Sequence, residues 1–212
     1  TFNWQGCEIY TASSPSSGGI FLQQTLQSLS HPKLITEGPH SAWTIQCISE
    51  ATSLAFKDRN RWLGDPAGFD FPLVDLVAKD YLADRCQRIS GSRFTRGGTP
   101  PEFPFLESKE TTHYSVVDVE GGAVSVTTTL NSGYGAKVMA PGGFFMNNEM
   151  DDFAIAPGVA NLYGLVQGKY NAVKAGRRPL SSMTPTIVVK NGYVDSVIGS
   201  PGGPTILTTV MQ

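Results

Sequence analysis

Residues 110–118 read Glu-Thr-Thr-His-Tyr-Ser-Val-Val-Asp, and this stretch places a threonine at the head of a predicted strand. The hydroxyl group of Thr111 is a weak nucleophile, so it needs an adjacent base to take its proton. A free α-amino group on the same residue can serve as that base, because its reference pKa of about 7.7–8.0 leaves a useful unprotonated fraction near neutral pH. That amine exists only after the bond between Glu110 and Thr111 is cut. The stretch therefore predicts an N-terminal nucleophile that chain cleavage activates.

The composition excludes several classes of function. The chain has 212 residues and a net charge of −2, and its sixteen Lys and Arg residues are dispersed rather than clustered. This distribution argues against a surface for nucleic acids or anionic membranes. Three cysteines, Cys7, Cys47 and Cys86, match neither a metal-ligand spacing nor an even-numbered disulfide framework. No apolar run approaches the roughly 20 residues that span a bilayer. We expect no metal and no cofactor.

The ends of the chain predict that it is a piece of a larger protein. It begins at Thr1 without a methionine and stops at Gln212 inside a predicted helix. Its length is still sufficient for one domain with an ample core. The absence of a signal sequence here therefore says little about destination.

The first part of the chain predicts a strand, a loop and a helix. Residues 7–10 predict the strand, and apolar positions at helical spacing predict the helix over 20–29. Between them, Ser, Pro and Gly residues predict a loop, in which Ser16 and Ser17 are candidate helix caps. The Ser-Ser-Gly-Gly sequence of this loop could instead hold an anion at the helix N-terminus.

Two more helices are predicted before the middle of the chain, over residues 42–56 and 73–88. A charged segment that ends in a Gly-Asp-Pro turn lies between them. Asp58 and Asp65 could be paired carboxylates for acid–base catalysis. Ion pairing with Arg59 and Arg61 at the end of the helix is the favoured interpretation.

Residues 90–110 are rich in Gly, Pro, Ser, Thr and charge, and they run directly into Thr111. This composition predicts a flexible connector, which would give access to a cleavage site but is also typical of any interdomain linker. We expect two units, residues 1–110 and residues 111–212.

The pattern changes to strands after Thr111. Alternating residues around a Glu-Gly-Gly turn predict a hairpin of strands 112–118 and 123–130. A three-residue loop at 119–121 sets Thr111 opposite Thr129, with Asn131 diagonal on the same face. A two-residue Gly-Gly turn would put Thr129 on the other side of the sheet. We favour the longer loop, which brings two hydroxyl groups and a carboxamide together.

Residues 147–153 form a polar and acidic cluster. Such a cluster could receive an ammonium group of a substrate. Calcium is a weaker interpretation, since the loop spacing and glycine of an EF-hand are missing. A solvated acidic turn remains an equal alternative from these residues alone.

The last part of the chain contains a polar loop, a hairpin and a glycine-rich turn. Residues 177–186 place two arginines beside Ser181 and Ser182, whose hydroxyl groups can bind a carboxylate. An Asn-Gly turn predicts a hairpin over 187–198. Gly202 and Gly203 then precede a predicted helix over 206–212, and their backbone N–H groups could form an oxyanion hole.

Together these segments closely resemble the gamma-glutamyltransferase (gamma-glutamyl transpeptidase, glutathione hydrolase) family of N-terminal nucleophile hydrolases. The resemblance covers nearly the whole chain, and its motifs occur in the order of the family. The motifs lie at residues 15–19, 63–66, 111–118, 147–153, 178–183 and 199–203.

The resemblance implies roles for individual residues. Self-cleavage is implied between Glu110 and Thr111, with Thr111 as the nucleophile and Thr129 as its hydrogen-bond partner in maturation and catalysis. The residues implied for the α-amino end of a γ-glutamyl group are Asn131, Glu149 and Asp152. Those implied for its α-carboxylate are Ser181 and Ser182, and those implied for the oxyanion are Gly202 and Gly203.

The resemblance also implies a fold, an activity and a location. The fold is α+β, a four-layer αββα sandwich of the N-terminal nucleophile hydrolase type, here lacking the first part of the large subunit and the end of the small one. Both subunits come from one precursor. The activity is transfer of the γ-glutamyl group of glutathione or related compounds to water, an amino acid or a peptide. The implied location is periplasmic, secreted or cell-surface.

Two departures and two alternatives accompany the resemblance. Pro204 and Thr205 stand where many members have a small residue and an arginine. The arginine that the family uses from the earlier part of the large subunit to bind the carboxylate has no counterpart here.

A related acylase, such as a cephalosporin acylase or poly-γ-glutamate transpeptidase, would keep the nucleophile and change the substrate. An unprocessed paralogue that only binds is the non-enzymatic alternative.

Overall fold

The computed structural model describes residues 1–30, 33–67, 72–91, 110–156 and 158–212. Its strands are β1 (Phe2–Trp4), β2 (Cys7–Thr11), β3 (Thr112–Val117), β4 (Ala123–Thr128), β5 (Thr186–Lys190) and β6 (Tyr193–Ile198). Its α-helices are α1 (Gly18–Ser28), α2 (Lys33–Glu37), α3 (Ala42–Trp62), α4 (Lys79–Arg88) and α5 (Ile206–Met211). Four short 3-10 helices are η1 (Asp75–Val77), η2 (Glu149–Asp152), η3 (Lys169–Asn171) and η4 (Gly203–Thr205). This mixture of helices and antiparallel sheets confirms the predicted α+β class.

One antiparallel sheet joins the two ends of the chain. Its strand order is β1-β2-β5-β6, so β2 near the N-terminus pairs with β5 near the C-terminus. The β5–β6 hairpin turns through Asn191 and Gly192, both with positive φ, as the Asn-Gly sequence predicts. This central pairing places the segment before β5 beside the loop before α1.

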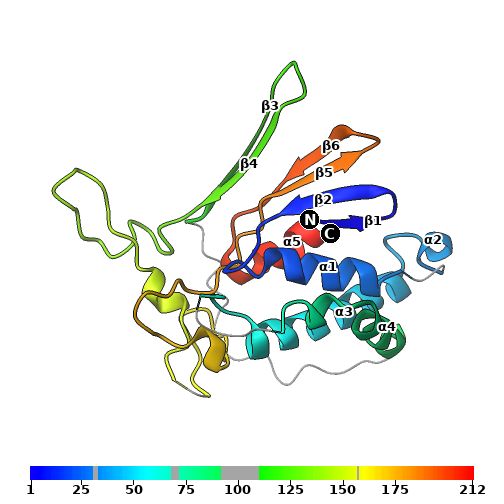
Figure 1. Cartoon of the computed structure of the whole chain (residues 1–212), viewed down its shortest axis with the longest axis horizontal. Helices are drawn as coiled ribbons and strands as arrows, with labels where there is room; N and C mark the ends of the chain where they lie inside the picture. Colours follow the sequence, from blue (N-terminus) through cyan, green and yellow to red (C-terminus); the bar gives the residue numbers. More distant parts are fainter. Residues whose placement is uncertain (31–32, 68–71, 92–109, 157) are drawn as a thin grey trace.

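Helices cover one face of this sheet (Figure 1). Helix α1 lies between the sheet and α3, and α5 packs beside α1. The core between these elements contains Phe21, Leu22 and Leu207, each at most 2% exposed. The apolar spacing predicted for 20–29 therefore marks a buried helix face, although the helix begins at Gly18 and ends at Ser28.

The β3–β4 hairpin has the predicted three-residue loop. Asp118 N donates to Gly122 O over 2.9 Å, and Gly121 has φ of 90°. Val117 therefore pairs with Ala123, and the pairing continues to Thr112 and Thr128 at the base. Ser115 and Ser125 on one face donate to the carbonyl oxygens of residues 197 and 198, which holds the hairpin against the end of β6.

Several boundaries differ from the sequence-based expectations. Helix α3 runs to Trp62 rather than residue 56, and its last turns bury Asp58 and Arg59. The predicted helix 73–88 is wrong as one element, because Ala78 has extended backbone between η1 and α4. Strand β1 and helix α2 had no prediction. The connector predicted at 90–110 lies mostly outside the described residues.

The loop before α1 has a different role from the one predicted. Ser16 Oγ accepts a hydrogen bond from Gly18 N over 3.1 Å, as a local cap does. Ser17 occupies the N-cap position, but its side chain makes no capping hydrogen bond. It donates instead to Ser181 O over 2.8 Å. The prediction of Ser17 as a side-chain cap is therefore wrong, and its hydroxyl joins α1 to the segment before β5.

The predicted ion pairs of Asp58 and Asp65 are also wrong in their partners. Asp58 pairs with Arg85 over 2.6 Å and accepts hydrogen bonds from Tyr81 and Gln24. Asp65 pairs with Arg178 over 2.9 Å, and this arginine holds the pKa of the Asp65 carboxyl well below its usual range. Each carboxylate thus binds a different distant arginine. They do not form a catalytic pair.

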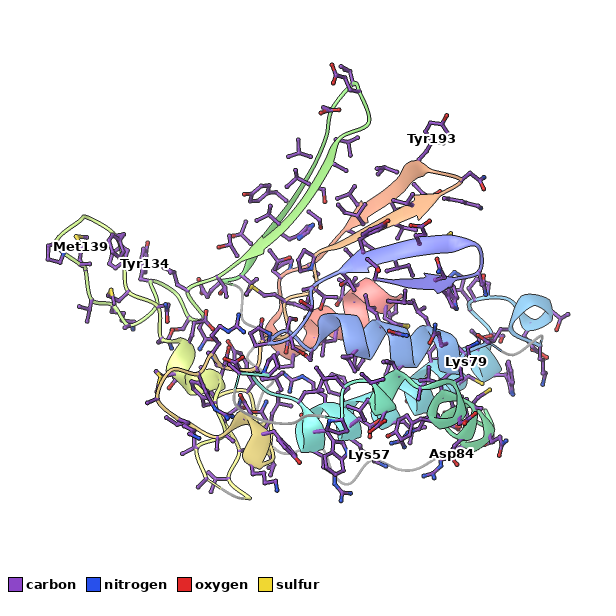
Figure 2. The ribbon with its side chains drawn as sticks, in the orientation of Figure 1. Lys57, Lys79, Asp84, Tyr134, Met139 and Tyr193 are labelled. Atoms are coloured by element: carbon purple, nitrogen blue, oxygen red, sulfur yellow. The ribbon has the colours of Figure 1, made fainter. Side chains whose placement is uncertain are left out.

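A pair of aspartates in this layer offers a test of the packing. Asp58→Ala should lower the free energy of unfolding by roughly 3–5 kcal/mol, because it leaves the Arg85 guanidinium buried without its carboxylate. Asp84→Ala is the matched control: Asp84 pairs with Arg88 on the solvent side, where both side chains are about half exposed (Figure 2). Its expected cost is within about 1 kcal/mol. Equal costs in chemical denaturation of the full-length protein would contradict the assigned Asp58 pair.

Candidate active site

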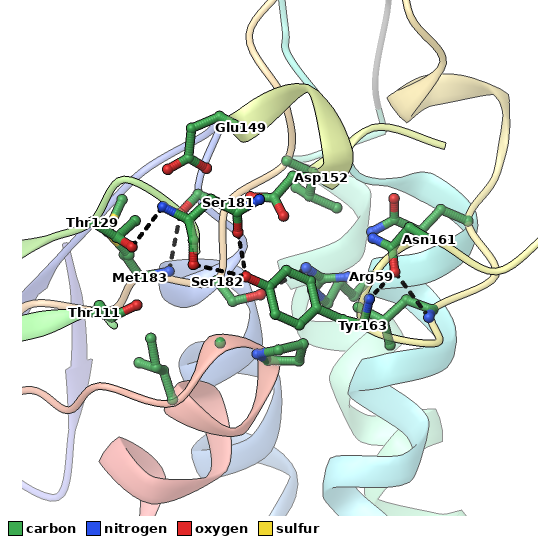
Figure 3. Close-up of a pocket in the computed structure, with 17 residues that line it drawn as sticks. Arg59, Thr111, Thr129, Glu149, Asp152, Asn161, Tyr163, Ser181, Ser182 and Met183 are labelled. Carbon is green, nitrogen blue, oxygen red and sulfur yellow. Dashed lines mark hydrogen bonds between the residues drawn. The ribbon is translucent and has the colours of Figure 1, made fainter. Parts of the chain in front are cut away.

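A pocket forms where the base of the β3–β4 hairpin, η2, η4 and the end of α3 meet (Figure 3). It encloses about 400 Å³ of space between atoms, a volume that includes its opening to solvent. Both predicted units contribute to its lining, which consists of Arg59, Thr111, Thr129, Asn131, Glu149, Asp152, Asn161, Tyr163, Leu165, Gln167, Leu180, Ser181, Ser182, Met183, Gly203, Pro204 and Ile206. All the predicted catalytic and binding residues except Gly202 are among them.

The hairpin register positions Thr111 in this pocket. Because Thr112 pairs with Thr128, the next residues, Thr111 and Thr129, stand opposite each other at the base of the hairpin. Thr111 is 7% exposed, and Thr129 Oγ1 accepts a hydrogen bond from Asn131 N over 2.9 Å. The structure thus brings the two hydroxyl groups and the carboxamide together as the register argument predicts.

The two serines lie on a segment that is fixed to the loop before α1. Ser181 N donates to Pro15 O over 3.0 Å, and Ser17 N donates to Ser181 O over 2.9 Å. Ser182 Oγ accepts a hydrogen bond from Arg59 Nη2 over 2.8 Å. Backbone contacts therefore set the position of both hydroxyl groups, and a buried arginine from α3 stands behind them.

Two acidic residues of η2, Glu149 and Asp152, line the pocket. Burial raises the pKa of Asp152 to about 8, and the neighbouring Glu149 carboxyl raises it in the same direction. Burial also raises the pKa of Glu149. Two acidic groups whose pKa values are both raised by burial favour a ligand that brings a positive charge, since such a charge stabilises both ionised forms.

The segment after η2 contributes residues that the sequence reasoning missed. The Tyr163 hydroxyl donates to Asn131 Oδ1. Asn161 Oδ1 accepts from Tyr163 N and Leu165 N, each over 3.0 Å, which shapes the turn that carries the tyrosine. The fully buried Asn171 donates to Asp152 O over 2.7 Å and accepts from Leu180 N over 2.9 Å. It thereby joins the acidic wall to the serine segment.

The glycine turn occupies the floor of the pocket beside α5. Gly202 and Gly203 have φ of 126° and 56°, values that favour glycine over other residues. Gly203 begins η4 and lines the pocket, whereas Gly202 does not. Pro204 follows at a position near the start of that 3-10 helix where the missing N–H has little effect. The departure at Pro204 is therefore compatible with the turn.

Some of the missed residues carried a weak signal and others carried none. Arg59 was assigned to an ion pair with a neighbouring aspartate because helix ends commonly carry such pairs. Its burial at 2% exposure depends on contacts with residues more than a hundred positions away. Tyr163 lies in a Gly-containing turn without recognised chemistry. Within the described ranges, no cluster of His, Cys, Asp and Glu is suited to a metal ion.

Comparisons with known proteins relate this chain to one enzyme family. The sequence profile of the gamma-glutamyltranspeptidase family matches residues 1–212. Glutathione hydrolase proenzymes from Pseudomonas sp. (strain A14) and Escherichia coli (strain K12) are 45% and 44% identical over 99% of this chain. The chain spans 37% of the length of each.

A solved structure extends the comparison to the fold. The cephalosporin acylase from Bacillus halodurans superposes with a TM-score of 0.76, over 100% of this chain and 35% of that one, at 21% identity. At this identity the likeness shows the fold alone: this chain has the fold of the matching part of that acylase.

The raised pKa of Asp152 predicts a pH dependence of stability. Between pH of about 4 and about 8 the folded carboxyl keeps a proton that the unfolded chain has released, so the free energy of unfolding falls as pH rises through this window. Asp152→Asn removes this titration. We measure the Tm of the full-length variant minus that of wild type at each pH. This difference should be roughly 3–6 °C more positive at about pH 8 than at about pH 5.

Asp151→Asn is the matched control for this measurement, because Asp151 is the exposed neighbour outside the pocket lining. Thermal unfolding at several pH values gives both differences. A Tm difference for Asp152→Asn that stays constant with pH would contradict the assigned proton.

Proposed function

The chain belongs to the gamma-glutamyltranspeptidase family, and on this premise we propose that it is the central part of a self-processing γ-glutamyl hydrolase and transferase. Residues 1–110 are the end of the large subunit and residues 111–212 the start of the small one, separated by cleavage between Glu110 and Thr111. The observation that supports this most strongly is the burial of Thr111 in one pocket with two acidic groups, two serines and a glycine turn.

In this proposal Thr111 is the nucleophile. Once its α-amino group is free, that amine takes the hydroxyl proton and Oγ1 attacks the γ-carbonyl carbon of the substrate. Thr129 donates a hydrogen bond to the Thr111 hydroxyl during maturation and catalysis. The backbone N–H groups of Gly202 and Gly203 stabilise the oxyanion. The amine product leaves with a proton, and water or an acceptor amine then releases the glutamyl group.

The walls of the pocket favour an amino acid headgroup over a simple acyl chain. Asn131, Glu149 and Asp152 bind the α-ammonium group of the γ-glutamyl substrate, which the two raised carboxyl pKa values favour. Ser181 and Ser182 bind its α-carboxylate. A glutaryl substrate lacks the ammonium group and would leave the acidic wall without a partner. Glutathione and other γ-glutamyl compounds are therefore the proposed substrates.

The family relationship also supports a periplasmic, secreted or cell-surface location for the full-length protein. Within the described part of the chain, no helix has the length and apolar character needed to cross a membrane. The proposed acceptors are water, amino acids and short peptides. The two subunits from one precursor are the proposed partners.

Substitution of two adjacent threonines tests the nucleophile. Thr111→Ala should abolish cleavage of the full-length precursor and lower turnover of a γ-glutamyl amide by roughly 10⁴-fold or more, because the attacking atom is gone. Thr112→Ala is the matched control, since Thr112 is exposed on the first position of β3 and does not line the pocket. It should be cleaved and active. Intact-mass measurement detects cleavage, and a rate assay measures turnover. Cleavage that persists in Thr111→Ala would refute Thr111 as the nucleophile.

A further inference from the structure

Arg59 is a buried cation in the wall of the pocket. It is 2% exposed, and it reaches the pocket from the last turn of α3 (Figure 3). Burial lowers its pKa to about 10, so the guanidinium stays charged at neutral pH. Among the residues that the structure describes, no carboxylate lies within ion-pair distance of it, and the nearby charge of Asp152 acts on it only at longer range. A buried charge in this state is stabilised by an anion.

Its hydrogen bonds hold the Ser182 hydroxyl group in a defined orientation. Arg59 Nη2 donates to Ser182 Oγ over 2.8 Å, so that oxygen accepts on its protein side and its own hydrogen is directed elsewhere. Ser181 Oγ similarly accepts from Met183 N over 3.0 Å. Both serines line the pocket. Since each oxygen already accepts a hydrogen bond from the protein, its O–H group can donate to a carboxylate bound there.

The same guanidinium connects these serines to the loop before α1. Arg59 Nε donates to Ser17 Oγ over 3.1 Å, and Ser17 Oγ donates onward to Ser181 O over 2.8 Å. Ser17 is 0% exposed and cannot touch a ligand itself. The Ser-Ser-Gly-Gly loop therefore does not bind an anion directly. It holds the arginine and the serine segment in one arrangement.

We propose that Arg59 is a positioning residue for a carboxylate subsite, in which it orients the Ser182 hydroxyl and places a buried positive charge behind the two serines that bind the α-carboxylate. The proposal rests on the proposed function, since it assigns the α-carboxylate of the γ-glutamyl group to Ser181 and Ser182. Glu149 and Asp152 line the same pocket, and a bound ammonium group favours their ionised forms. A zwitterionic amino acid headgroup therefore matches the acidic groups with its ammonium group and the serines with its carboxylate.

The test compares substrates that differ only in the α-carboxylate. Full-length, processed protein is assayed with γ-glutamyl-p-nitroanilide and with γ-aminobutyryl-p-nitroanilide, which keeps the amino group and lacks the carboxylate. Arg59→Gln should raise KM for the first substrate roughly 10- to 100-fold with a smaller change in kcat, and change the second little. Arg59→Lys should recover part of the loss, because it restores the charge without the guanidinium fork.

Arg61→Gln is the matched control. Arg61 is exposed, lies over the ring of Trp62 and does not line the pocket. Its kinetic constants should equal those of wild type.

An Arg59→Gln variant that loses activity equally on both substrates would show a structural role and overturn the proposal. A variant that discriminates between the two substrates as well as wild type does would also overturn it. If Arg59→Gln fails to fold, as judged by thermal unfolding, the substrate ratio of Arg59→Lys carries the test: an unchanged ratio overturns the proposal, and a reduced one supports it.

A binding measurement separates this proposal from the proposed function. Calorimetry compares L-glutamate with γ-aminobutyrate in wild type and in the Arg59 variants. If the preference of wild type for L-glutamate falls roughly 10-fold or more in the variants, the carboxylate subsite is supported. This holds even if wild type turns over no γ-glutamyl amide, a result that would contradict the proposed function and leave the subsite standing. Wild-type protein that binds L-glutamate no better than γ-aminobutyrate overturns the subsite.

Discussion

The backbone pairing of β3 with β4 controls the position of Thr111. The ladder runs from Val117 and Ala123 at the tip to Thr112 and Thr128 at the base. Because side chains alternate along a strand, a shift of one residue would turn the Thr129 hydroxyl to the other side of the sheet. Gly121 in the left-handed conformation sets the loop that excludes this shift. The conformation of one glycine at the tip therefore helps to decide which side chains meet at the other end of the hairpin.

The walls of the pocket depend on contacts between distant parts of the chain. The pairing of β2 with β5 places residues 181–186 beside the loop before α1. Asn171 then attaches the acidic segment to Leu180. As a result, the buried Arg59 and Asp152 line the same pocket. Burial of the Arg59 guanidinium and the Asp152 carboxyl lowers the free energy of unfolding, because both groups lose contact with water. Groups buried at such a cost are typical of sites that bind a ligand.

Local features could be predicted from the sequence and long-range partners could not. The two hairpins and the buried face of α1 follow from turn residues and periodicity, whereas the predicted site residues of the second unit are those that the family resemblance implies. The partner of Asp58 could not be found, because Arg85 is as plausible by sequence as Arg59. The burial of Arg59 and the contact of Tyr163 with Asn131 depend on tertiary packing. The break at Ala78 has no helix-breaking residue to announce it.

The proposed function depends on one central claim: that cleavage before Thr111 frees the α-amino group that activates the Thr111 hydroxyl, and that this hydroxyl forms the covalent intermediate. The most direct measurement is mass spectrometry of full-length protein quenched during turnover of a γ-glutamyl amide. We predict a peptide whose first residue is Thr111 and which carries one glutamyl group on that residue. A glutamyl adduct on another residue, or active protein in which Glu110 remains joined to Thr111, would contradict the account.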